Sequence, residues 1–122
     1  MPKQPRVLIA DDHAEMAKAV SRLLALYCEV LGTVADGRAV LSAVQSLQPD
    51  VIVLDLNIAD VNGLEVCRRI TQLDAKVKVI VFSATNDPEL AQLAMEAGAS
   101  ACVSKGTGDL LSTIKRLCDD PG

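Results

Sequence analysis

Short runs of branched aliphatic residues alternate with longer amphipathic stretches along the whole chain. The apolar runs cover residues 6–10, 51–54, 77–82 and 101–104, and a less apolar run covers residues 29–35. Strands that are apolar throughout must be buried on both faces, which is typical of a parallel sheet covered by helices. Five strands and five helices in strict alternation predict a doubly wound α/β fold, with residues 29–35 at an edge of the sheet.

The stretches between the runs show helical periodicity and helix start signals. Asn62 is expected to cap the third helix, with Glu65 completing a capping box. Asp87 and Pro88 are expected to begin the fourth helix as N-cap and first helical residue. Apolar stripes are expected to face the core, and in the first helix the stripe is Ala17, Val20, Leu24 and Tyr27.

Composition narrows the class of protein. The 122 residues suit one domain, and a hydrophobic content of 50% supports a core that must be largely aliphatic, because Tyr27 and Phe82 are the only aromatic residues. A net charge of −4 and the lack of a basic run argue against direct binding of nucleic acid by this chain. No segment has the character of a membrane span or a signal peptide, so we expect no membrane association and a cytoplasmic location.

The cysteines fit that location. Cys28, Cys67, Cys102 and Cys118 are scattered, without the CxxC spacing of a zinc or redox site. We expect them to act as small core residues in a reducing compartment, with a redox pair as the less favoured alternative.

Each buried run leads to a residue that can handle phosphate or metal. Asp11 and Asp12 follow the first run, Asp55 follows the third, Ser83 the fourth, and Lys105 comes soon after the last. Because the carboxyl ends of parallel strands meet at one edge of a sheet, these groups are expected to share one site. Three carboxylates packed together repel one another, so the site implies a bound cation, a nucleophile, or both.

The residue types suit phosphoryl transfer. A carboxylate held at a strand tip, such as Asp55, can attack phosphorus and form an acyl phosphate. Asp11, Asp12 and Asp55 offer the oxygen ligands that Mg²⁺ prefers, and the cation would screen the repulsion between nucleophile and phosphate. Lys105 can pair with a phosphoryl oxygen and Ser83 can donate a hydrogen bond, which supplies the positioning and charge neutralisation that the reaction needs.

Each residue alone also has an ordinary structural explanation. Asp55 could form a turn, Asp12 could cap the first helix, and Lys105 could be a solvated surface charge. His13, the only histidine, is expected to be a surface residue without partners. The alignment of all these groups with strand ends favours the site, whereas nucleotide binding has no support because neither GxxxxGK[ST] nor GxGxxG occurs.

In order and spacing, these residues resemble the receiver domain of bacterial two-component response regulators over nearly the whole chain. The resemblance is carried by Val7–His13, Asp50–Leu56, Asn62–Gly63, Val81–Ala84, Ala97–Ala99 and Lys105. It implies the flavodoxin-like strand order 2-1-3-4-5 and a single receiver domain over residues 1–122, of which 119–122 would suit the start of a linker.

The resemblance also implies a function. Asp55 would accept a phosphoryl group from the phosphohistidine of a sensor histidine kinase in a magnesium-dependent reaction. Asp11, Asp12, Asp55 and the backbone carbonyl of Asn57 would hold Mg²⁺, while Ser83 and Lys105 would read out the phosphoryl group. The chain would then be a phosphoacceptor switch that catalyses its own phosphorylation and dephosphorylation, rather than an enzyme with a separate substrate.

The output partners implied by the resemblance lie outside this sequence. Residues 10–13 and 35–38 are similar to those of receivers that are fused to a helix-turn-helix DNA-binding domain. Two alternatives stay open: the chain is a stand-alone receiver, or it is the N-terminal part of a longer regulator whose C-terminal DNA-binding domain would control transcription. A homodimer is a further candidate assembly.

Three positions depart from the family pattern and leave alternatives open. Ile58-Ala59 stands where Met-Pro is usual, Gly106 where proline is usual, and Cys102 where an aromatic residue usually moves with the switch. One alternative is a pseudo-receiver that serves as a dimerisation or docking module. The other is a metal-dependent phosphohydrolase with an Asp nucleophile, which Asn57 disfavours because such enzymes need a second acid at that position.

Overall fold

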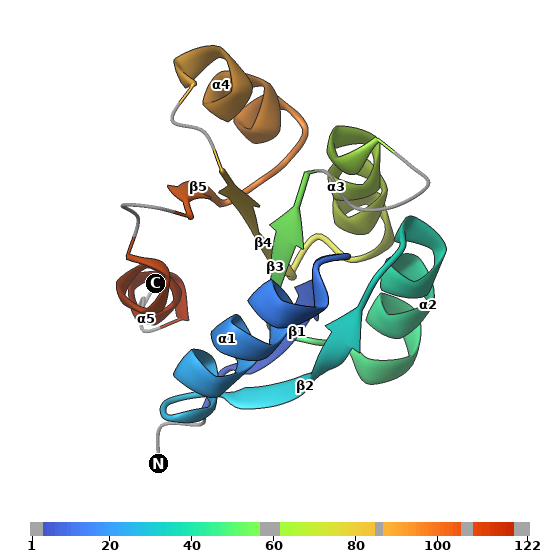
Figure 1. Cartoon of the computed structure of the whole chain (residues 1–122). Coiled ribbons are helices and arrows are strands. Elements are labelled where there is room, and N and C mark those ends of the chain that lie inside the picture. Colours follow the sequence, from blue (N-terminus) through green and yellow to red (C-terminus); the bar gives the residue numbers. More distant parts are fainter. Residues whose placement is uncertain (1–3, 57–61, 85–86, 106–108, 119–122) are drawn as a thin grey trace.

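The computed structural model describes residues 4–56, 62–84, 87–105 and 109–118, in which strands and helices alternate strictly (Figure 1). The strands are β1 (Arg6–Ala10), β2 (Glu29–Val34), β3 (Val51–Asp55), β4 (Lys78–Ser83) and β5 (Ala101–Ser104). The helices are α1 (Ala14–Ala25), α2 (Gly37–Leu47), α3 (Gly63–Leu73), α4 (Pro88–Glu96) and α5 (Leu110–Cys118).

The five strands form one parallel sheet in the order β2-β1-β3-β4-β5. This order confirms the doubly wound fold and the edge position of the second strand. Strand order reverses between β1 and β3, and in folds of this kind ligands bind beyond the carboxyl ends of the strands at such a reversal. β3 lies in the middle of the sheet and is buried at every position, because neighbouring strands and helices cover it on all sides.

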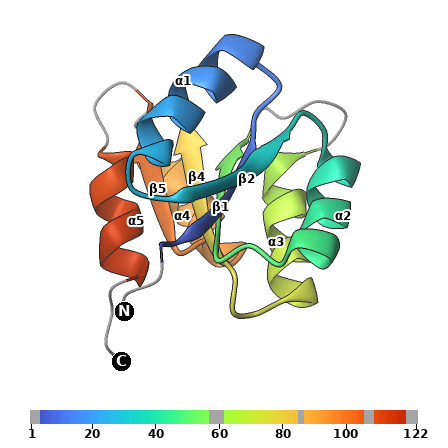
Figure 2. The ribbon, with the colours of Figure 1, turned by 90° about the horizontal axis from the view of Figure 1, so that it is seen from below.

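Helices cover both faces of the sheet and create two apolar cores (Figure 2). One core joins the sheet to α1 and α5 and contains Leu24, Val53 and Ile114. The other joins it to α2, α3 and α4 and contains Val44, Ile70 and Ala94, with Cys67 among them. Alternate residues of each strand point to opposite cores, so a continuous apolar run satisfies both. Within the described residues, no helix combines the length and apolar character that crossing a membrane requires.

Tyr27 does not extend the buried stripe of α1. The helix ends at Ala25, and the Tyr27 side chain lies 48% exposed, with the Lys115 Nζ 4.3 Å from its ring centroid. The chain turns after the helix and buries Cys28 in the core instead. The amphipathic period therefore predicted the stripe correctly up to Leu24, but the helix stops before the period would bring Tyr27 inward.

The helix starts agree with the sequence in part. Asn62 caps α3 by accepting a hydrogen bond from the Leu64 N–H (2.9 Å), and Asp87 caps α4 by accepting one from the Glu89 N–H (2.9 Å). The capping box at Glu65 is wrong, because its carboxylate pairs with Arg68 (2.7 Å) and Arg69 (3.3 Å) further along the helix. These partners are neighbours on the helix surface, so the pairs form without strain.

The apolar stripes of the other helices were also expected to face the core, but three of their leucines are partly exposed. Leu47, Leu73 and Leu93 are 37%, 46% and 48% exposed. Leu47 and Leu73 are the last residues of α2 and α3, and Leu93 lies in the last turn of α4. In α4, all of whose residues are described, Ala94 alone is buried, so this helix is the least embedded of the five.

Gly63 supplies a stability test of the fold. A Cβ at this position would meet the backbone of Leu56 at 2.5 Å, so Gly63→Ala must displace either α3 or the end of β3. Helix propensity alone would favour alanine by about 1 kcal/mol or less, but overpacking should prevail and destabilise the domain by about 1–3 kcal/mol. Urea denaturation measures the change, and Gln72→Ala, at an exposed position of the same helix, should stay within about 0.5 kcal/mol. A stabilised Gly63→Ala variant would contradict the close contact.

Candidate functional site

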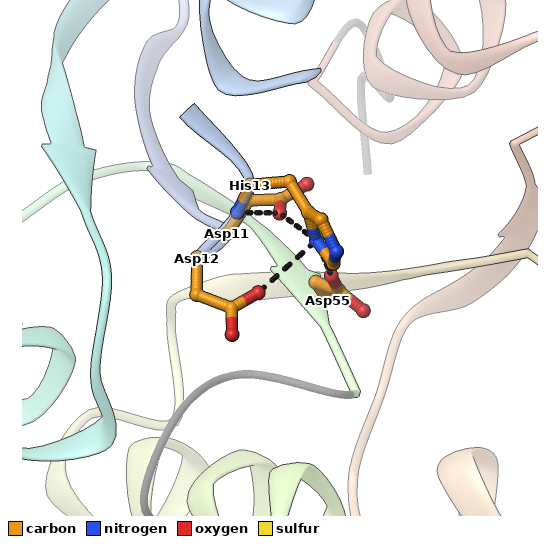
Figure 3. A group of neighbouring side chains, drawn as sticks. All are labelled: Asp11, Asp12, His13 and Asp55. Carbon is orange, nitrogen blue, oxygen red and sulfur yellow. Dashed lines mark hydrogen bonds and ion pairs between the residues drawn. The ribbon is translucent and has the colours of Figure 1, made fainter. Parts of the chain in front are cut away.

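Four strands bring the predicted polar residues to one edge of the sheet. Asp11 follows β1, Asp55 ends the adjacent β3, Ser83 ends β4, and Lys105 follows β5. Register explains the convergence, since Ala10 pairs with Leu54, Asp55 with Phe82 and Ser83 with Ser104. Residues that are up to 94 positions apart in sequence thereby meet in one pocket, as Figure 3 shows for the acidic part.

Lys105 is held at the centre of this pocket. Its backbone N–H donates to the Ser83 carbonyl (2.7 Å), which continues the pairing of β4 with β5 by one residue. Its Nζ lies 3.1 Å from the Asp55 Oδ2 and 3.4 Å from the Asp11 Oδ2, and only 14% of the side chain is exposed. The ammonium therefore bridges two carboxylates that come from different strands.

The pocket carries an excess of negative charge. Asp11 and Asp55 are 5% and 2% exposed, whereas the Asp12 side chain is 30% exposed. Buried carboxylates are costly unless they are paired, and among the described residues Lys105 provides one ammonium for these three acids. Even a protonated His13 would leave the acids in excess, so a further cation would be favoured here.

His13 belongs to the acidic cluster, contrary to the expectation that it has no partners. Its Nδ1 lies 3.1 Å from the Asp12 Oδ1, 3.3 Å from the Asp11 Oδ1 and 3.8 Å from the Asp55 Oδ2, although the side chain is 67% exposed (Figure 3). Its backbone N–H also donates to the Asp11 Oδ1 (2.9 Å). His13 is the residue at the N-cap of α1, so the alternative that gave this place to Asp12 is wrong.

The donor set fits a divalent cation. One ligand atom each from Asp11, Asp12, His13 and Asp55 can be chosen so that all lie within 4.8 Å of one another. Carboxylate oxygens at this spacing suit Mg²⁺, which is commonly held by one or two carboxylates together with waters. Asn57, the fourth predicted ligand, lies outside the described residues, as do Ile58, Ala59 and Gly106.

Ser83 lies at the pocket end of β4, whereas Cys102 lies further back in β5. Ser83 is 6% exposed at the last position of β4, next to the Lys105 anchor. Cys102 is half-buried in β5 and packs against the core beneath α2, α3 and α4. Burial raises the pKa of the Cys102 thiol, and it raises that of Cys67 to about 11. Both therefore stay protonated at neutral pH, which is the behaviour expected of core thiols.

The fold and pocket define a doubly wound domain whose acidic carboxyl edge is bridged by a lysine. Residues 7–115 match the family model described as response regulator receiver domain. The chain belongs to this family, whose members serve in two-component signalling.

Known relatives place this domain within larger proteins. The chain is 35% identical over 122 residues to a protein-glutamate methylesterase/protein-glutamine glutaminase of Geobacillus kaustophilus, covering 97% of this chain and 35% of that protein. It is 32% identical over 100 residues to the DNA-binding response regulator MtrA of Mycobacterium tuberculosis, covering 82% of this chain and 43% of MtrA. The chain thus spans less than half the length of either relative.

A solved structure shares the whole fold. A LuxR-family two-component response regulator from Aurantimonas sp. SI85-9A1 superposes with a TM-score of 0.91 at 26% identity, covering 96% of this chain and 86% of that one. Agreement at this level over the full sheet supports the same placement of the carboxyl edge.

Removal of the bridging ammonium tests the electrostatics of the pocket. Lys105→Met keeps the length of the side chain but leaves Asp11 and Asp55 without their charged partner, and it should lower the free energy of unfolding by about 1–3 kcal/mol. The same substitution in an Asp55→Asn background should cost less, because one of the repelling charges is gone. Denaturation of the four proteins of this double-mutant cycle gives the coupling between Lys105 and Asp55, and equal losses in both backgrounds would show that this pair contributes nothing to stability.

Proposed function

We propose that the chain is a phosphorylation-dependent switch in which Asp55 is the phosphoacceptor. The observation that carries the proposal is the position of Asp55, which is 2% exposed at the tip of the central strand and 3.1 Å from the Lys105 ammonium. A carboxylate held there has little freedom, so one oxygen is presented for attack on phosphorus. Membership of the receiver family supports the same role.

Asp11, Asp12, Asp55 and the backbone carbonyl of Asn57 would hold Mg²⁺ beside the phosphoacceptor. When bound, the cation would neutralise charge shared between the carboxylates and the incoming phosphoryl oxygens. The excess of acids over the Lys105 ammonium supports this requirement.

The phosphoryl donor would be the phosphohistidine of a sensor histidine kinase. The bond between phosphorus and the kinase nitrogen breaks as a bond forms between phosphorus and an Asp55 oxygen, giving an acyl phosphate. Lys105 then pairs with a phosphoryl oxygen and the Ser83 hydroxyl donates to another, which stabilises the charge of the product. Attack of water on phosphorus later releases phosphate and restores the carboxylate, so the domain catalyses both its own phosphorylation and its reset.

The output would be a change at the α4–β5 surface. Ser83 and Lys105 connect the pocket to β4 and β5, and Ala94 is the one fully buried residue of α4. A helix with so little buried surface belongs to the low-stability part of a domain, which suits a two-state element. Cys102 is too small to act as the moving aromatic group of the family, so the response would depend on Ser83 and the shift of α4. The partner would be an output domain that controls transcription, or a second copy, in the cytoplasm.

Asp55→Asn tests the phosphoacceptor. Wild-type protein incubated with acetyl phosphate and Mg²⁺ should gain one phosphoryl group by intact-mass spectrometry, and the variant should gain none, because an amide oxygen is too weak a nucleophile. Asp74→Asn is a matched control, since Asp74 follows α3 at the opposite end of the sheet and should leave labelling unchanged. Persistent labelling of Asp55→Asn would refute the assignment, and a wild-type protein that binds no Mg²⁺ would favour the pseudo-receiver.

Ser83→Ala separates phosphorylation from readout. The variant should still be labelled at Asp55, because neither nucleophile nor acidic ligand is lost, but its α4 resonances should move less on labelling than those of the wild type. Amide NMR spectra before and after acetyl phosphate measure the difference. An unchanged shift pattern in the variant would remove Ser83 from the switch.

A further inference from the structure

We propose that His13 adds a nitrogen ligand to the acidic cluster, so that the pocket binds Zn²⁺ through Asp11, Asp12, His13 and Asp55 and is then closed to phosphorylation. Zinc binding itself needs these four side chains and a shift of the Lys105 ammonium, which lies 3.1 Å from the Asp55 Oδ2 and 3.4 Å from the Asp11 Oδ2. Its inhibitory consequence rests on the proposed role of Asp55.

The separations between the ligand atoms are close to those that zinc requires. Zinc bonds to carboxylate oxygen and imidazole nitrogen of about 2.0–2.2 Å place tetrahedral neighbours about 3.3 Å apart. The His13 Nδ1 lies 3.1, 3.3 and 3.8 Å from its three carboxylate neighbours, and the whole set fits within 4.8 Å. The imidazole is thus already near zinc spacing from each carboxylate, whereas the carboxylate oxygens would have to move closer to one another to surround one ion.

The backbone conformation of His13 places its imidazole beside the carboxylates. His13 occupies the N-cap of α1 with φ −91° and ψ 103°, yet in the described part of the chain its side chain makes no capping bond. Asn, Asp, Ser and Thr are preferred at this position because their side chains satisfy the helix N–H groups, which stabilises a helix by about 1 kcal/mol. Here the imidazole is turned toward the carboxylates instead (Figure 3). A side chain that faces metal-binding carboxylates instead of capping its helix is expected when the residue serves a binding site rather than helix stability.

The nitrogen ligand changes which metal the pocket favours. Mg²⁺ takes oxygen ligands and keeps several waters, so it leaves positions open for a phosphoryl oxygen. Imidazole suits Zn²⁺, and zinc sites with four protein ligands are closed. A zinc ion held by all four side chains would have no coordination position left for a phosphoryl oxygen of the donor. His13 would then make the switch sensitive to zinc, while a pocket of oxygens alone would remain a magnesium site.

The experiment compares wild type with His13→Asn, both without an affinity tag. Asparagine is a good N-cap, so the variant should fold, but it lacks the imidazole. Calorimetric titration should show that the variant binds Zn²⁺ at least about tenfold more weakly, while its affinity for Mg²⁺ stays within about twofold. Because the chain has a single histidine, its ring nitrogen resonances report directly on metal binding, and the Nδ1 signal should shift with Zn²⁺ and not with Mg²⁺.

Two controls make the outcomes decisive. The half-buried thiols of Cys102 and Cys118 could take zinc, so the titrations are repeated in a Cys102→Ser/Cys118→Ser background, where the dependence on His13 should persist. Equal zinc affinity with and without the imidazole would overturn the inference, and so would a parallel loss of Mg²⁺ affinity, which would mean that His13 only shapes the pocket. Labelling of Asp55 by acetyl phosphate is scored separately. Its absence without zinc would refute the proposed function, whereas labelling that zinc fails to suppress would refute the closed site.

Discussion

The ammonium of Lys105 between two buried carboxylates is the interaction on which the pocket depends. Asp11 and Asp55 come from adjacent strands, and without a positive group between them their burial would oppose formation of the sheet edge. Lys105 reaches this place because its own N–H continues the β4–β5 ladder. The register of the strands therefore brings the charged groups together. A slip of one residue in any of these strands would turn its side chain to the other face and break the ion pairs, so the pairs also favour the native register.

The same interaction leaves the pocket short of positive charge. One lysine and a solvent-exposed histidine face three acids, so the resting domain retains electrostatic repulsion at its carboxyl edge. Functional sites often store such costs, which the rest of the fold must offset. Here the offset comes from two aliphatic cores and a central strand that is buried throughout. This repulsion would favour the binding of a cation, and the imidazole of His13 would favour zinc over magnesium.

The alternation of strands and helices and the shared pocket were predictable because they follow from periodicity and from where polar residues end each apolar run, and the strand order followed from the resemblance to receiver domains. The partners of side chains on the surface could not be predicted in this way. The periodicity that placed Leu24 inside also assigned Tyr27 to the core, since it carries no signal for a helix that stops at Ala25. Glu65 has two basic neighbours one turn ahead, and these compete with the N-cap for its carboxylate. The partners of His13 were missed for two reasons. Asp11 and Asp12 precede it directly in sequence and give no sign that their side chains turn toward the imidazole, and Asp55 comes near only through the pairing of β1 with β3.

The contact between Gly63 and Leu56 has a mechanical consequence. With no side chain on Gly63 to act as a cushion, the first turn of α3 rests directly on the backbone just past Asp55. Because the two backbones are in such close approach, a displacement at the tip of the central strand would also move the first turn of α3. Chemistry at one buried oxygen would in this way reach α3 directly, on the same face of the sheet as α4, and give the surface of the domain a second connection to its centre.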